Sequence, residues 1–218
     1  MTEYQPTERT RVRRKPSRGN YDREVIHAIL DEALICHIGF AVNGQPYVIP
    51  TIHARVGERL YLHGSQRSRA FGEVAVGTPC CVTASLVDGL VLARSATQHS
   101  LNYRSAIILG TGRRVTEPEE KTAALQAVVE HIVPGRWDEV RGPSADELDE
   151  TFVIGIEIEE ASAKARTGPS IDKRGDVDPE KWAGILPVEI STAEPVPGED
   201  VQPDLPIPPH VAEWGRGQ

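Results

Sequence analysis

Two serines and two arginines directly follow a short apolar strand pattern in the stretch LYLHGSQRSRAF, residues 60–71. A strand that ends at a glycine and turns into a helix presents free backbone N–H groups and a positive dipole end to an anion. Ser65 and Ser68 add hydroxyl donors, and Arg67 and Arg69 add planar guanidinium groups that suit phosphate. The alternative is a solvated turn in which a serine caps the helix. The stretch by itself leaves both interpretations open.

His63 immediately precedes this turn, and the ordinary pKa of an imidazole suits proton transfer near neutral pH. It is therefore the candidate catalytic residue, with a purely structural role at the strand end as the alternative. Three further histidines lack neighbours at metal-ligand spacing: His53, His99 and His131. The sequence predicts no metal site.

The elements that would position these side chains are mostly strands. Apolar patterns predict strands over 34–42, 45–56, 59–63, 103–115 and 151–166, and a hairpin over 80–96 that turns at Val87-Asp88. Gly110 and Gly112 suggest a bend or bulge in the strand over 103–115. Asn43-Gly44 is typical of a tight hairpin turn. Helices are predicted over 21–33 with Asn20 as N-cap and over 66–76. Capping boxes at Thr116–Glu119 and Ser144–Glu147 predict two more, over 117–132 and from Ser144 to Glu150. This spacing favours a small six-stranded antiparallel barrel with inserted helices.

The charge is spread unevenly along the 218 residues, and it suggests three parts. Residues 1–19 form a basic N-terminal arm, 20–170 the barrel domain, and 171–218 an acidic, proline-rich extension that packs on or wraps the barrel. The net charge of −8 argues against nucleic acid as a partner of the whole surface.

Several function classes are excluded by composition. No apolar run is long enough to span a bilayer, and no secretory or twin-arginine signal is found, so we expect no membrane association. Three cysteines without a CxxC pattern indicate reduced, buried thiols. We therefore expect a cytoplasmic protein. Neither a Rossmann nor a P-loop motif is present.

Four segments together resemble the pyridoxamine 5'-phosphate oxidase-like flavoproteins, and more closely the nitroimidazole-resistance (Nim) type branch. They are CHIGFAVNGQPYVIPTIH, LYLHGSQRSRAF, GLVLARSATQHSLNYRSAIILGTGRRV and SAKARTGP, and the resemblance covers about residues 14–187. It implies a split β-barrel that forms a homodimer and holds FMN at the subunit interface. Pairing would also cover apolar strand surface that a small barrel leaves exposed.

The resemblance assigns cofactor contacts residue by residue. Ser68 and Arg69 match the segment that grips the FMN phosphate, with Ser65 assisting. The other implied flavin contacts are Val48, Ile49, Pro50 and Thr51 along the ring, Tyr61, Leu62, His63 and Gly64 beneath it, and Asn102, Tyr103 and Arg104 from the partner subunit.

Two departures from the oxidase proper argue against vitamin B6 oxidation. Ala70 and Phe71 follow the Ser-Arg pair where the oxidase has basic residues, and the proline-rich end has no counterpart of its substrate-binding Arg/His segment.

The function expected from the resemblance is an FMN-dependent oxidoreductase. It would pass electrons from a nicotinamide donor to a small electrophile such as a nitroaromatic, with the flavin supplying the redox chemistry. Two alternatives remain. One is a haem-binding split barrel with His63 or His99 as axial ligand, and the other is a non-catalytic flavin-binding or sensing module. A deazaflavin in place of FMN is also open.

Overall fold

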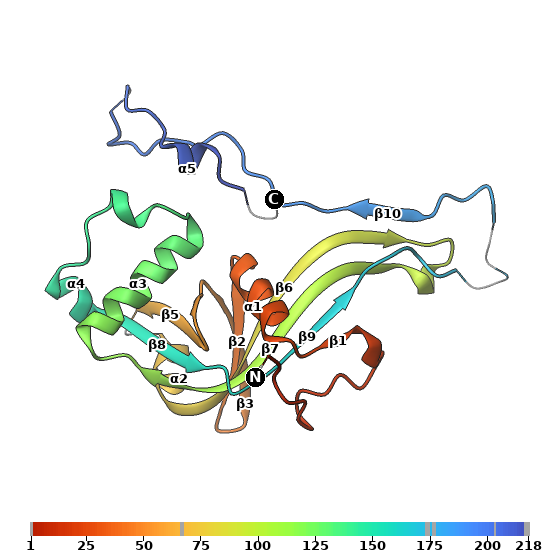
Figure 1. Ribbon diagram of the computed structural model, residues 1–218, viewed down its shortest axis with the longest axis horizontal. Coiled ribbons are helices and arrows are strands. Elements are labelled where there is room, and N and C mark those ends of the chain that lie inside the picture. The colour runs from red at the N-terminus through yellow and green to blue at the C-terminus, as the bar shows by residue number, and fades with distance from the viewer. Residues whose placement is uncertain (1, 66–67, 173–174, 176–177, 203, 216–218) are drawn as a thin grey trace.

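The computed structural model describes residues 2–65, 68–172, 175, 178–202 and 204–215, and the protein is mainly antiparallel β structure (Figure 1). The strands are β1 Gly19–Asn20, β2 Cys36–Val42, β3 Gln45–Thr51, β4 Ala54–Val56, β5 Arg59–Ser65, β6 Val76–Leu92, β7 Ser100–Arg114, β8 Thr151–Glu157, β9 Glu160–Arg166 and β10 Gly184–Pro187. The helices are α1 Arg23–Glu32, α2 Arg69–Ala75, α3 Pro118–Ile132, α4 Ala145–Glu150 and α5 Pro209–Ala212, with 3-10 turns at Pro16–Arg18, Ala96–Gln98 and Trp137–Glu139.

The strands form one sheet in the order β3-β2-β6-β7-β8-β5-β4 within the described residues, and every pairing is antiparallel. The long strand β7 pairs with β6 along one edge and with β8 and then β9 along the other. Strand β1 adds to β9, and β10 adds to β6. Because β7 spans both halves, it links the barrel to the extended ribbon that Figure 1 shows beside it.

The predicted hairpin turn is confirmed between β2 and β3. Asn43 and Gly44 have φ values of 50° and 80°, the left-handed backbone that such a two-residue turn requires. The pairing then continues without a break from Val42 opposite Gln45 to Cys36 opposite Thr51.

The predicted hairpin over 80–96 is wrong, because residues 80–92 belong to the single strand β6 and the last four lie beyond its end. Its register against β7 shifts between Val87 and Gly89, so the extra residue Asp88 is accommodated as a bulge and not as a turn. Conversely, the predicted strands 45–56 and 151–166 each divide, into β3 with β4 and β8 with β9. Together with the short strands β1 and β10, which the sequence did not predict, the sheet has ten strands in the part of the chain that the structure describes, against the predicted six.

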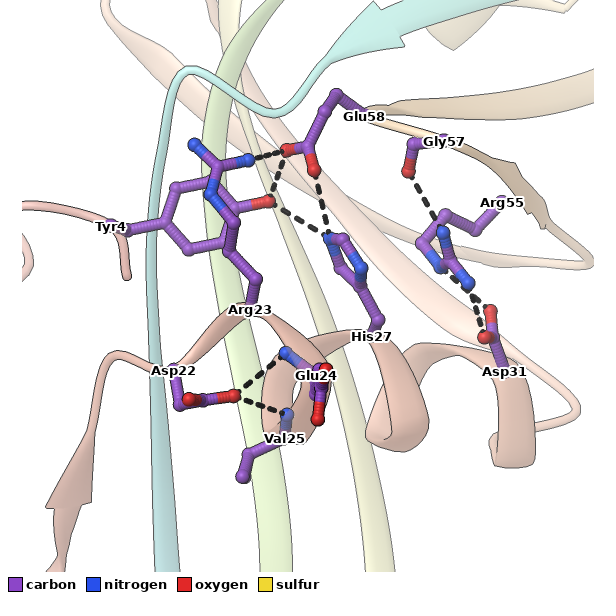
Figure 2. Close-up of polar contacts among 10 residues, drawn as sticks. All are labelled: Tyr4, Asp22, Arg23, Glu24, Val25, His27, Asp31, Arg55, Gly57 and Glu58. Atoms are coloured by element: carbon purple, nitrogen blue, oxygen red, sulfur yellow. Dashed lines mark hydrogen bonds and ion pairs between the residues drawn. The ribbon is translucent and has the colours of Figure 1, made fainter. Parts of the chain in front are cut away.

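The core lies between the sheet and two of the helices. Ile26, Ile29 and Leu30 of α1 are buried against barrel residues such as Ile108, and Ala124 and Val128 of α3 cover the far side of β5 and β8. Helix α1 begins behind Asp22, not behind the predicted Asn20. The Asp22 carboxylate accepts hydrogen bonds from the backbone N–H groups of Glu24 and Val25, at 2.8 and 3.3 Å (Figure 2).

The two capping boxes predicted from sequence differ in outcome. Ser144 and Glu147 form a complete capping box at the start of α4, as predicted. At α3 the predicted box at Thr116 is wrong, because the helix begins behind Glu117 without a side-chain cap. Pro118 occupies the first turn there, where a missing N–H costs nothing.

All three cysteines are free thiols. Cys36 and Cys80 are buried, and burial raises the pKa of both thiols to about 12, so they stay protonated. Cys81 is only partly buried, which corrects the expectation of three buried thiols.

The C-terminal extension contacts the body at several places, among them an ion pair between Arg94 and Asp172. Strand β10 pairs with β6 from Gly184 opposite Leu92 to Pro187 opposite Gly89, and the Trp214 indole donates to the carbonyl of Ile132 in α3 at 2.7 Å. Figure 1 shows the extension running above the sheet between these points. None of the described helices combines the length and the apolar character needed to cross a bilayer.

Candidate functional site

A cavity of about 220 Å³, here called the barrel cavity, opens where β3 and β5 end beside α2. Eight of the residues predicted to contact a cofactor line it: Ile49, Pro50, Thr51, Leu62, His63, Gly64, Ser65 and Ser68. They come from two segments of the chain, 49–51 and 62–68, whose nearest members are eleven positions apart in the sequence. The fold therefore brings the predicted ring-facing strand and the predicted phosphate turn to one site.

Local structure explains how β5 delivers this turn. The strand pairs with β8 over its whole length, from Arg59 opposite Glu157 to Ser65 opposite Thr151. At Gly64 the Phe71 ring packs so closely that a Cβ would lie 3.0 Å from it, which favours glycine. The backbone N–H of Ser68, just before α2, donates to the carbonyl of Ser65 at the end of β5, at 2.9 Å.

The Ser68 hydroxyl is not used as a helix cap. Ser68 occupies the N-cap position of α2, yet its side chain makes no capping hydrogen bond. The capped-turn interpretation of this stretch therefore does not account for the hydroxyl, which lies at the wall of the barrel cavity instead.

His63 carries the most distinctive polar atom of the cavity. Its Nδ1 is buried and makes no hydrogen bond within the described structure. Burial lowers the pKa of His63, so the imidazole is neutral at neutral pH. Because a buried polar atom without a partner is costly, this nitrogen indicates a ligand that would satisfy it.

The structure does not describe the side chains of the two arginines in the predicted phosphate site. Arg69 is the first residue of α2, but its side chain, like the whole of Arg67, lies outside the described part of the chain.

Two of the predicted contacts point away from the cavity. Val48 is 68% exposed on β3, on the strand face opposite that of Ile49. Tyr61 packs under α3, where its hydroxyl donates to Glu120 at 2.8 Å and lies 3.2 Å from the Arg59 guanidinium. In both cases successive side chains along a strand point to opposite faces of the sheet, so a residue next to a cavity-lining residue in the sequence faces away from the cavity.

The predicted segment Asn102-Tyr103-Arg104 on β7 does not line the barrel cavity of its own chain. Asn102 is buried and accepts a hydrogen bond from Arg166. Arg104 donates at 2.7 Å to both Glu32 and Asp88. The resemblance places this segment at the partner's site, which a single chain does not contain.

Sequence reasoning missed the apolar wall of the cavity, formed by Ile38, Phe71 and Ile154. Ile154 lies directly opposite Leu62 in the pairing of β8 with β5, about 90 residues further along the chain. Their apolar side chains mark Ile38 and Ile154 on strands and Phe71 in α2 as candidates for burial, but only the tertiary structure shows that they share a cavity.

The fold and this cavity define a split β-barrel protein of the flavin-binding type. The family model described as pyridoxamine 5'-phosphate oxidase matches residues 22–165, about two thirds of the chain. The chain therefore belongs to this family, and the predicted fold is confirmed.

Solved structures add more specific similarities. The flavocytochrome Anf3 from Azotobacter vinelandii is 37% identical, with 97% of this chain and 99% of that chain covered and a TM-score of 0.88. A protein from Mycobacterium smegmatis described as FAD and haem binding is 31% identical, with 89% and 95% covered and a TM-score of 0.84.

A protein from Bacteroides thetaiotaomicron shares the fold, and its description as a 5-nitroimidazole antibiotic resistance protein is a provisional one. It is 23% identical, with 67% of this chain and 85% of that chain covered and a TM-score of 0.57. No curated protein matches the sequence.

Proposed function

We propose that this protein is a flavin-binding oxidoreductase whose barrel cavity receives the flavin. The observation that carries the proposal is the barrel cavity itself, which brings His63, Ser65 and Ser68 together beside an apolar wall. Two relatives that align over nearly the whole chain are described as a flavocytochrome and as an FAD- and haem-binding protein, which supports the same class.

The residues of the cavity fit a flavin chemically. Ile49 and Leu62 offer apolar contact for a planar ring, and Pro50 lacks the N–H that would bind a further strand. Ser65 and Ser68 supply hydroxyl donors for a phosphate. His63 in its neutral form can donate one hydrogen bond and accept another, so it can orient a ring heteroatom or hold a substrate proton. A bound flavin would supply the two-electron redox chemistry.

The size of the cavity supports a homodimer. At about 220 Å³ it is below the about 300–1,000 Å³ typical of pockets that enclose a ligand. A second copy of the chain would complete the site, and Asn102, Tyr103 and Arg104 of that copy are the candidate contacts. The electron donor we propose is a nicotinamide nucleotide, and the acceptor is a small electrophile such as a nitroaromatic.

We propose haem as a second cofactor, because two relatives with more than 30% identity are described as a flavocytochrome and as a haem-binding protein. His63 and His99 are the candidate axial ligands. The Nδ1 of His99 lies 3.0 Å from the Ser95 carbonyl. An Nδ1–H donated to a carbonyl leaves Nε2 as a lone-pair donor, which is the usual arrangement of a metal-binding histidine.

The visible absorption spectrum of purified protein, followed by denaturation and identification of what is released, tests this function. We expect flavin bands together with a Soret band. Chromatography of the released flavin separates FMN, FAD and a deazaflavin, and loss of the Soret band in His63→Ala or in His99→Ala identifies the ligand. A colourless protein that binds neither added flavin nor haem would refute the proposal. Bound flavin without turnover of any nicotinamide donor would favour a sensing module.

A further inference from the structure

A second cavity, of about 430 Å³, is strongly basic. We call it the basic pocket, and it lies where the N-terminal arm meets β9 and the tip of the β6–β7 ribbon. Five cationic side chains line it: Arg14, Lys15, Arg18, Lys164 and Arg166. No aspartate or glutamate is among its described lining residues. The family match begins at residue 22, so the arm adds this feature to the shared barrel.

Strand pairing explains why cations distant in sequence converge here. Gly19 of β1 lies opposite Lys164 of β9, so the arm residues just before Gly19 reach the end of β9. On its other edge β9 pairs with β7, where Arg166 lies opposite Tyr103. Three strands thus carry the arm, the lysine and the tyrosine to one place, as the lower right of Figure 1 shows for β1 and β9.

Arg166 is a buried charge without a counter-charge. It is only 6% exposed, and its guanidinium donates to three neutral oxygens: the side-chain oxygen of Asn102 and the carbonyls of Gly168 and Pro169, the latter two at 3.2 and 3.1 Å. No carboxylate of the described residues pairs with it. Since a buried charge is costly unless it is paired, this site favours an anionic ligand.

The cations of the arm are crowded as well. Lys15 adopts a left-handed backbone with φ of 54°, which is unusual for a residue other than glycine. The positive charge of Arg18 lowers the pKa of Lys15, with burial and the charges of Arg14, Arg166 and Lys164 adding to the effect. Within the described chain neither Lys15 nor Arg18 forms an ion pair. The fold therefore holds like charges together that an anion would neutralise.

We propose that the basic pocket binds the diphosphate of an adenine dinucleotide. Several cations with forked guanidinium groups match the charge and geometry of two phosphates, and Ser100 adds a hydroxyl. The Tyr103 ring offers a face on which a base can stack. His99, one of the two candidate haem ligands, also lines this pocket. The wall is nevertheless mainly charged and polar, which suits a nucleotide better than the apolar macrocycle of haem.

The adenosine diphosphate group has two possible sources. One is the flavin itself, which would make the cofactor FAD, and this source rests on the proposed function. Both phosphates would then lie in the basic pocket, and Ser65 and Ser68 would face the ribityl chain instead of a phosphate. The other is the nicotinamide donor. The shared chemistry is the diphosphate, and the experiment below separates the sources.

The test compares the full-length wild type with Lys15→Glu/Arg18→Glu. The control Arg11→Glu/Arg13→Glu makes the same change in net charge in the same arm, at exposed residues that do not line the pocket. Equal melting temperatures would establish that both variants fold. Three quantities are measured: the FAD, FMN and haem released per chain, the KM for NADH and NADPH, and the Kd of ADP by calorimetry.

If the diphosphate belongs to the flavin, the wild type releases FAD. Lys15→Glu/Arg18→Glu, the pocket variant, then retains at least about tenfold less FAD, while the control variant retains as much as the wild type. If it belongs to the donor, flavin content stays equal, and the KM for the donor and the Kd of ADP rise by at least about tenfold.

Two results would overturn the inference. One is equality of all three quantities, within twofold, between the pocket variant and the control. The other is a selective loss of haem with FAD and ADP binding intact, which would show that the cations hold haem propionates. A protein without any flavin that still binds ADP through Lys15 and Arg18 would refute the proposed function and leave this inference standing.

Discussion

Tyr4 donates a hydrogen bond from its hydroxyl to Glu58 Oε2 at 2.5 Å, across 54 positions of the chain. The Tyr4 side chain is buried, and the Arg23 guanidinium lies 4.1 Å from its ring centroid and also pairs with Glu58. His27 Nε2 lies 3.0 Å from the same hydroxyl (Figure 2). This network ties the N-terminal arm to α1 and to the turn between β4 and β5, and the same arm supplies three cations of the basic pocket.

Replacing Tyr4 by Phe tests this attachment. The change keeps the ring but leaves Glu58 and His27 without their shared hydroxyl, so we expect unfolding in urea to become easier by about 1 kcal/mol. Tyr103→Phe is the matched control, because the Tyr103 hydroxyl makes no hydrogen bond to the described residues. Equal stability of wild type and Tyr4→Phe would show that packing alone holds the arm.

A second prediction concerns pH and His63. Burial lowers the pKa of His63, so the unfolded chain binds the proton more readily than the folded protein. Stability is therefore complete above the ordinary histidine pKa of about 6.5 and falls as the pH drops below it. His63→Gln should lose less stability than wild type between pH 7.5 and 5.5 in urea unfolding.

The control for this comparison is His37→Gln, which changes an exposed histidine and should follow the wild type. Burial also lowers the pKa of His27, so some loss between these pH values remains in every variant. If wild type and His63→Gln lose stability equally, His63 is not a buried neutral imidazole.

The third prediction concerns Gly110 on β7, where the sequence suggested a bend or bulge. The register is regular there, and the reason for glycine is close approach: a Cβ would collide with the carbonyl oxygen of Glu157. Gly110→Ala should destabilise by about 1–3 kcal/mol, because backbone must move apart. Gly142→Ala has no heavy atom within 4 Å of its new Cβ and should change stability little. Thermal unfolding of the two variants makes the comparison.

The fourth prediction concerns Arg104, whose guanidinium lies between Glu32 of α1 and Asp88 of the β6 bulge. Arg104→Met would leave two carboxylates facing each other, so we expect the free energy of unfolding in urea to fall by about 1–2 kcal/mol. This loss is smaller than for a fully buried pair, because solvent screens the partly exposed charges. Adding Glu32→Gln should recover part of that loss. A stable Arg104→Met variant that loses flavin would instead assign this arginine to the cofactor, as the family resemblance implies.

Local features were predictable where a few neighbouring residues decide the structure. The Asn43-Gly44 turn and the capping box at Ser144 depend on contacts within four residues, and both are as predicted. The hairpin turn predicted at Val87-Asp88 is instead a bulge, since a short polar break between two apolar runs is compatible with either. The Asp88 side chain is held by Arg104, a contact across strands that sequence spacing does not reveal.

The sequence by itself determined the family, the strand-rich fold class, and eight residues that line one cavity, because the motif LYLHGSQRSRAF and its companion strand carry them in order. Tertiary structure alone decided that Tyr61 faces away from that cavity, and that Lys15, Lys164 and Arg166 share another. The physical reason is strand pairing. Register sets which face a side chain takes and which distant residue lies opposite it, and it follows from the packing of the whole sheet.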